Sequence, residues 1–171
     1  MQLRFGNGQT QMKNLRAPGG PEQVFQLGFE YRDPQFWNVG LTVNHFSNTF
    51  ISPSGLLRSD NFALDTDGLV YNDYDPTIAK TLLKQERFED YRLVNMIGGK
   101  SWRIGGNYIG VFAVINNLFN QEYRSGGFEQ SRKSNFRTRR EDMNRENGPL
   151  FGNRYFFGFG TTYYVMAYIR F

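Results

Sequence analysis

Few residues of this 171-residue chain are of a type and spacing that could do chemistry. His45 is the only histidine and cysteine is absent, so the chain alone assembles neither a catalytic triad nor a multi-histidine or cysteine-ligated metal site. Residues 65–68 (Asp-Thr-Asp-Gly) match the start of a calcium loop, but Leu69 stands where an oxygen ligand is required and no glutamate closes the loop. We therefore predict a turn at this position, no enzymatic activity, no metal site and no cofactor.

Basic side chains are frequent between residues 121 and 154. The candidates for binding an anionic ligand, or the phosphates of lipopolysaccharide, are Arg132, Lys133, Arg137, Arg139 and Arg140. Guanidinium groups bind phosphate and carboxylate in bidentate fashion. Acidic residues lie among them, however, which favours a solvated loop of mixed charge. The net charge of +4 is spread along the chain without a nucleic-acid-binding motif, so no nucleic-acid partner is expected.

The elements that must position these residues are β-strands, and the final seventeen residues show the pattern most plainly. One apolar face of this terminal strand carries Tyr163, Val165, Ala167, Ile169 and Phe171. Residues 161–171 alone have the length of roughly 9–11 residues that a strand needs to cross an outer membrane, and rings at 156, 157 and 159 extend the predicted strand. In outer-membrane proteins of this appearance, such an end is the signal that the barrel assembly machinery recognises.

Four earlier strands are predicted at 24–32, 36–50, 89–103 and 108–120, although the alternation in the third is blurred. Short turns at 33–35 and 104–107 separate them from one another, and longer loops lie at about 1–23, 52–88 and 121–154. Within the middle loop, Asp75 and Pro76 predict the start of a helix over 77–87. The predicted fold class is all-β, an antiparallel meander of five long strands. Alternating short and long connections are typical of bacterial barrels, whose short turns are periplasmic and whose long loops are extracellular.

One motif resembles a known family. Residues 117–123 (Asn-Leu-Phe-Asn-Gln-Glu-Tyr) resemble the N-L-F-x-x-x-Y signature near the C-terminus of TonB-dependent outer-membrane receptors. Further matching stretches lie at residues 28–34, 83–86, 98–102, 126–132 and 168–171. Together they resemble the receptors that carry an N-terminal carboxypeptidase-regulatory-like domain.

This resemblance implies a barrel of about 22 strands in the outer membrane of a Gram-negative bacterium, with this chain as its last five strands. It also implies TonB-driven uptake of a siderophore, cobalamin, oligosaccharide or peptide. The implied partners are outer-membrane lipid and lipopolysaccharide, the barrel assembly machinery, a surface lipoprotein, and the TonB complex through an N-terminal part that this chain lacks. No export signal opens the sequence, so we expect a fragment that does not transport by itself.

The alternative is a soluble all-β module that binds a ligand or carbohydrate, in which the aromatic residues form a core and a sugar platform. A small self-contained barrel is disfavoured, because closure takes about eight strands or more. The two remaining interpretations differ in where the apolar side chains lie. The membrane interpretation requires one continuous outer band that includes Phe25, Leu27, Val39, Leu41, Val165 and Ile169.

Overall fold

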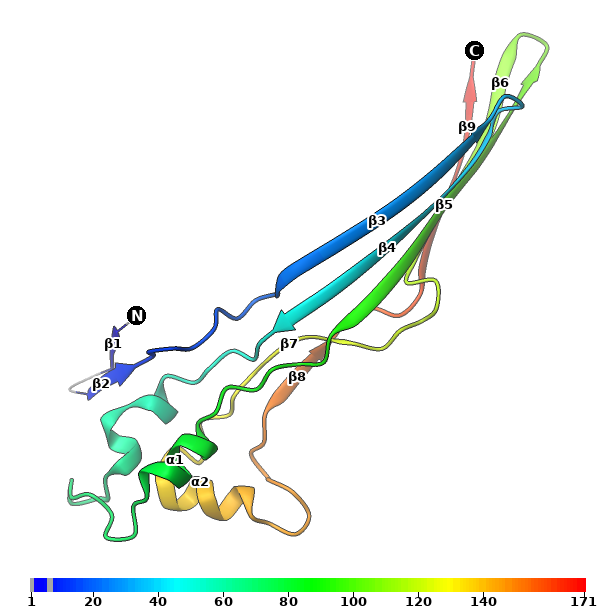
Figure 1. Ribbon diagram of the computed structural model, residues 1–171. Coiled ribbons are helices and arrows are strands. Elements are labelled where there is room, and N and C mark those ends of the chain that lie inside the picture. The colour runs from blue at the N-terminus through cyan, green and yellow to red at the C-terminus, as the bar shows by residue number, and fades with distance from the viewer. Residues whose placement is uncertain (1, 6–7) are drawn as a thin grey trace. The chain divides into compact units, whose positions relative to one another are not determined.

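The computed structural model describes residues 2–5 and 8–171, and the chain divides into two compact units (Figure 1). The sheet unit comprises Pro21–Asn48, Glu89–Arg124 and Phe157–Phe171. The loop unit comprises Met1–Gly20, Thr49–Phe88 and Ser125–Phe156. Strands account for 47% of the structure and helices for 14%, which confirms the all-β class.

The sheet unit holds one antiparallel sheet of five strands, which run side by side in Figure 1. Its strands are β3 (Pro21–Asp33), β4 (Trp37–Thr49), β5 (Tyr91–Ile104), β6 (Asn107–Asn116) and β9 (Thr162–Arg170). They are neighbours in that order, so every long strand pairs with the next one along the chain. The predicted five-stranded meander is therefore confirmed.

Both predicted short turns are present, and each has a local cause. Between β3 and β4, the Phe36 amide donates to the Asp33 carbonyl oxygen (3.0 Å), and Asp33 Oδ1 accepts from the Gln35 amide (2.8 Å). Between β5 and β6, Gly105 and Gly106 have φ angles of 55° and 90°. Two consecutive left-handed residues fit a two-residue hairpin turn whose twist matches that of the strands, and glycine adopts this conformation at little cost.

Two predicted strand ends are wrong. The fourth long strand, predicted to reach residue 120, ends at Asn116, because Asn117 has a left-handed φ of 51° and leaves the ladder. The terminal strand is not continuous over 155–171. Residues Arg154–Phe157 form a separate strand, β8, which pairs with β7 (Arg124–Phe128), and β9 starts only at Thr162. The rings at 156 and 157 consequently do not extend β9.

The three segments predicted as loops carry secondary structure. The elements are β1 (Gln2–Phe5), β2 (Gly8–Gln11), the 3-10 helices η1 (Leu56–Arg58) and η2 (Asp60–Ala63), α1 (Pro76–Leu82), β7, α2 (Phe136–Met143) and β8. Asp75 caps α1 as predicted, since its Oδ1 accepts from the amides of Thr77 (2.7 Å) and Ile78 (3.3 Å). The helix ends at Leu82, well before the predicted residue 87. Helix α2 was not predicted, because its residues are mostly charged.

The apolar core lies in the loop unit. Leu57, Phe62, Ala79 and Phe136 are buried together, and α1 and α2 lie beside each other there (Figure 1). In the described residues of the sheet unit, by contrast, only two glycines and the polar residues Ser47 and Asn117 are buried. None of the helices in the described chain is long and apolar enough to cross a membrane.

Candidate functional site

The face of β9 that carries the predicted assembly signal continues onto β6. The register pairs Ile109 with Ile169, Val111 with Ala167, Ala113 with Val165 and Ile115 with Tyr163. Paired residues of antiparallel strands point to the same side of a sheet, so these eight side chains form one apolar surface. Tyr163 and Val165 remain 80% and 63% exposed. Phe171, just beyond β9, is 95% exposed.

The same face extends over the other three strands. Ile115 pairs with Met96, and Met96 pairs with Leu41, which carries the surface onto β5 and β4. On β3, the Phe25 ring stacks against His45 (6.4 Å between centroids) and the Tyr31 ring lies 5.1 Å from Trp37. The register and the alternation therefore place all six residues of the predicted band on one face. They are Phe25, Leu27, Val39, Leu41, Val165 and Ile169.

One lysine on this face, Lys100, directs its charge away from the neighbouring apolar side chains. Lys100 pairs with Trp37, and its Nζ donates to the carbonyl oxygen of Gln35 in the β3–β4 turn (2.5 Å). The aliphatic part of a lysine can thus cover apolar surface while the ammonium group lies at the rim. Lys100 itself lies within the face, because it also pairs with Val111 and the Trp102–Ile109 pair continues the face beyond it. Its ammonium group, however, lies at the β3–β4 turn.

The opposite face is mixed and contains hydrogen-bonded polar groups. The hydroxyls of Ser101 and Tyr168 lie 2.6 Å apart, and Asn116 Nδ2 donates to Thr162 Oγ1 (3.3 Å). The Tyr168 ring lies directly over Gly110, where an added Cβ would be 2.3 Å from the ring carbon Cζ. This face therefore combines polar contacts with a ring that requires glycine on the neighbouring strand.

The motif at 117–123 serves as a structural joint. Asn117 is 4% exposed, and its Nδ2 donates to the carbonyl oxygens of Gln121 (3.0 Å) and Phe159 (3.1 Å) while its Oδ1 accepts from the Gln121 amide (2.8 Å). Its own amide donates to Asn95 Oδ1 (3.0 Å). The Thr161 hydroxyl donates to the Asn117 carbonyl oxygen (2.8 Å). One asparagine thus fastens the end of β6 to β5 and to the segment that leads into β9.

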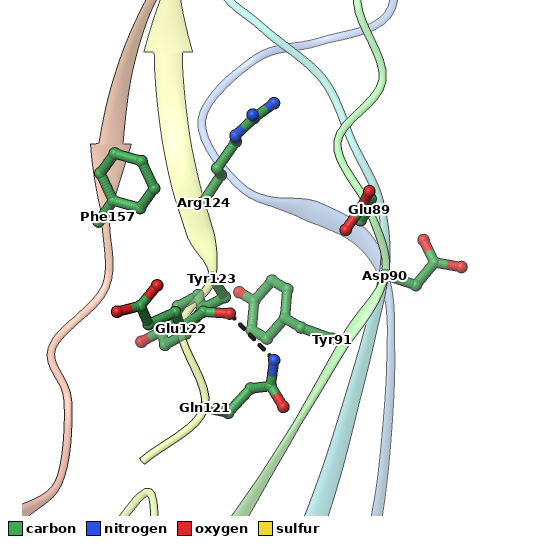
Figure 2. Close-up of a pocket in the computed structure, with 8 residues that line it drawn as sticks. All are labelled: Glu89, Asp90, Tyr91, Gln121, Glu122, Tyr123, Arg124 and Phe157. Atoms are coloured by element: carbon green, nitrogen blue, oxygen red, sulfur yellow. Dashed lines mark hydrogen bonds between the residues drawn. The ribbon is translucent and has the colours of Figure 1, made fainter.

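A pocket of about 210 Å³ lies beside this joint, and Figure 2 shows the residues that line it. The Tyr91 and Tyr123 rings stack with centroids 4.2 Å apart, and the other neighbour of Tyr91 is Phe46 at 4.8 Å. Tyr123 also lies against Gly158, where an added Cβ would be 1.9 Å from its ring. Both tyrosine rings are therefore engaged by neighbouring residues, Tyr91 by Phe46 and Tyr123 by Gly158.

The carboxylates near this pocket do not form a metal centre. Glu89, Asp90 and Glu122 line it, yet the described residues contain no group of three or more acidic or histidine side chains placed to hold a metal ion. The predicted turn at 65–68 is confirmed, because Asp65 Oδ1 accepts from the amides of Asp67 and Leu69 (both 2.9 Å) and Gly68 has a φ of 79°. The Asp65 carboxylate is thus engaged by its own turn.

The predicted basic cluster does not form one surface. Arg137 and Arg140 both reach Asp73, at 2.6 Å and 2.5 Å, which lowers the pKa of that carboxyl, chiefly through the hydrogen bond from Arg137. Arg139 is buried and donates to the Phe151 carbonyl oxygen (3.3 Å). Arg132 lies over the Phe151 ring (5.4 Å), and Lys133 is half-buried. Much of this positive charge therefore stabilises the loop unit internally.

A second group of cations was missed by the sequence analysis. Lys13, Arg16, Lys80 and Lys84 line one pocket in the loop unit. More than sixty positions of sequence separate the first two residues from the last two, so no motif could have joined them.

Comparison with known proteins identifies no relative. No family model matches the chain, and no curated protein or solved structure is significantly similar to it.

Proposed function

We propose that this chain forms part of the transmembrane wall and the extracellular loops of a TonB-dependent receptor in the outer membrane of a Gram-negative bacterium. The receptor takes up a scarce nutrient, such as a siderophore, cobalamin, an oligosaccharide or a peptide, and the chain alone is not transport-competent. The observation that carries this proposal is the apolar face shared by all five strands of the sheet unit, where the described residues build no buried apolar core.

An apolar face of this extent needs an apolar covering, since large exposed apolar patches mark membrane or partner surfaces. Strands of 9 to 14 residues match the roughly 9–11 tilted residues that cross a bilayer. Within the described chain, the outer strands β3 and β9 each have one neighbour in this sheet. Unpaired backbone is costly in hydrocarbon, so further strands of a closed barrel would have to pair with both edges.

The exposed end of β9 supplies the first experiment. A terminal strand can add to an open sheet edge by backbone hydrogen bonds while alternate side chains provide selectivity. Deleting Phe171 from the receptor should lower its level in purified outer membranes, whereas Arg170→Ala should have a milder effect, because Arg170 pairs with Tyr108 on the opposite face. A receptor that reaches normal levels without Phe171 would contradict the assembly signal.

The second experiment tests the topology. Because the chain contains no cysteine, each introduced cysteine is the single labelling site in it. Single cysteines at Leu69 and Asn147, which are exposed in the loop unit, should react with an impermeant thiol reagent on intact cells. A cysteine at Gln35, in the β3–β4 turn, should react only after the outer membrane is opened. The reverse pattern would invert the topology, and recovery of the protein in the soluble fraction would favour the soluble binding module.

A further inference from the structure

A basic pocket in the loop unit has no role in the proposed membrane wall. It has a volume of about 790 Å³, and its cations are Lys13 and Arg16 on one side and Lys80 and Lys84 at the end of α1 on the other. Arg58 also lines it but is already paired with Glu129. None of the described residues that line this pocket is acidic. The lining therefore contains three lysines, Lys13, Lys80 and Lys84, with no carboxylate among the residues beside them in the lining.

Local contacts hold the two sides of the pocket together. The Gln85 side chain connects them. Its Oε1 accepts from the Arg16 amide (2.8 Å), and its Nε2 donates to the carbonyl oxygens of Arg16 (3.1 Å) and Ile51 (2.8 Å). The Arg16 guanidinium lies over the Phe50 ring, 6.0 Å from its centroid. These hydrogen bonds hold the segment that carries Lys13 and Arg16 beside the end of α1, despite the positive charges on both sides.

The three lysines differ from the other cations of this unit. Arg58, Arg137 and Arg140 each have an acidic partner. Lys13, Lys80 and Lys84 are exposed, and no acidic residue of the described chain forms an ion pair with them. Lys80 lies in α1 and Lys84 lies two residues beyond its last residue, and both line the pocket. A bound anion would reduce the repulsion between these like charges.

We propose that this pocket binds a compact organic anion with several carboxylate or phosphate groups and an apolar part. The ammonium groups of the three lysines supply charge-assisted hydrogen bonds to such oxygens, while Phe50, Leu15 and Leu83 provide the apolar part of the lining. Every lining residue belongs to the loop unit, so this inference does not depend on the assignment of the sheet unit to a membrane. The shared chemistry fits a free solute or a lipid headgroup, and the experiment distinguishes these sources.

The test is calorimetric titration of the whole chain in an uncharged detergent, with citrate and pyrophosphate as soluble probes. Phosphatidylcholine nanodiscs with and without phosphatidylglycerol provide the lipid arm. Binding of a soluble probe should weaken with added salt, because exposed charges are screened. The Lys80→Gln/Lys84→Gln double variant should raise Kd by about tenfold, a loss in line with two partly exposed charge contacts. Glutamine keeps the helix propensity close to that of lysine.

Two matched variants distinguish an effect of the positive charges in the pocket from an effect of the net charge of the loop unit. Lys80→Arg/Lys84→Arg should retain binding, and Arg145→Gln removes one exposed charge of the same unit outside the pocket and should leave Kd unchanged. Lys13→Gln, in an irregular segment, tests the pocket without touching α1 and should weaken binding by about fivefold. Binding of phosphatidylglycerol discs alone, lost in the glutamine variants, would assign a headgroup. Absence of binding to every probe, or an affinity unchanged in the glutamine variants, would overturn the proposal.

Discussion

Replacing Glu129 with leucine should destabilise the loop unit by about 3–5 kcal/mol, the usual cost of leaving one partner of a buried ion pair uncompensated. The side chains of Arg58 and Glu129 are only 6% and 4% exposed. Glu129 accepts hydrogen bonds from both terminal nitrogens of Arg58 and from the Ser54 amide (2.8 Å). Arg58 also donates to the carbonyl oxygens of Ser54 (3.1 Å) and Leu83 (2.9 Å). Removing the carboxylate therefore leaves a buried guanidinium without a counter-charge, while the backbone carbonyl oxygens still hold it in place.

The double variant Arg58→Met/Glu129→Leu should recover most of this loss and lie within about 1–2 kcal/mol of the unsubstituted chain, because two apolar side chains remove both charges together. The residual cost comes from the Ser54 amide, which loses its acceptor, and from the carbonyl oxygens of Ser54 and Leu83, which lose the Arg58 donor. Glu141→Gln, an exposed position on α2, is the control and should change the free energy of unfolding by less than about 0.5 kcal/mol.

Hydrogen exchange followed by mass spectrometry is the appropriate assay, because it resolves the two units. Peptides covering 52–60 and 127–131 should lose protection in Glu129→Leu and regain it in the double variant. Trp37 and Trp102 both lie in the sheet unit, so tryptophan fluorescence during urea unfolding reports on that unit separately. A single variant that costs under about 1 kcal/mol, or a double variant as unstable as the single one, would refute the ion-pair argument.

Three further predictions follow from other contacts. Asn117→Ala should cost about 2–3 kcal/mol, since it leaves buried backbone groups without partners at a φ of 51°; unchanged exchange of the Gln121 amide would contradict this. Gly110→Ala should cost about 1 kcal/mol through contact with the Tyr168 ring and nothing in a Tyr168→Leu background, measured as a double-mutant cycle in urea. The ion pairs of Asp73 with Arg137 and Arg140 should persist in mild acid, because they lower the pKa of the Asp73 carboxyl. The stability that they contribute is fully present above about pH 4 and is lost only as the pH falls through the lowered pKa. Exchange at 71–74 followed against pH should show this loss in the unsubstituted chain but not in Arg137→Gln/Arg140→Gln, and the same profile in both would contradict it.

Regular alternation of side chains was sufficient to predict most of the sheet. Strands β3 and β4 and the apolar face of β9 follow directly from period-two patterns, and the glycine pair at 105–106 predicts its hairpin. The cap of α1 is equally local, because an aspartate followed by proline specifies a helix start. These features depend on neighbouring residues only, so the linear sequence contains the relevant physics.

The sequence was insufficient to predict which strand each segment pairs with. Both faces of β5 carry apolar residues, and only its register with β4 and β6 places Val94 and Met96 on the apolar band. Residues 155–157 continue the alternation of the terminal strand, yet hydrogen bonds with β7 separate them from β9. A period-two pattern specifies that a segment is extended and which side chains share a face, but not which strand it pairs with.

Long-range contacts also decided what the charged residues do. The sequence alone indicated that the arginines at 137 and 140 belong to a solvated loop, but the fold places Asp73 within ion-pair distance of both. The basic pocket forms where Gln85 hydrogen-bonds the backbone of Arg16, 69 residues earlier in the chain. Composition and alternation thus determined the all-β class and the apolar faces. Only the tertiary structure decided which charges are neutralised and which stay available, because ion pairing depends on distances of a few ångströms between residues far apart in sequence.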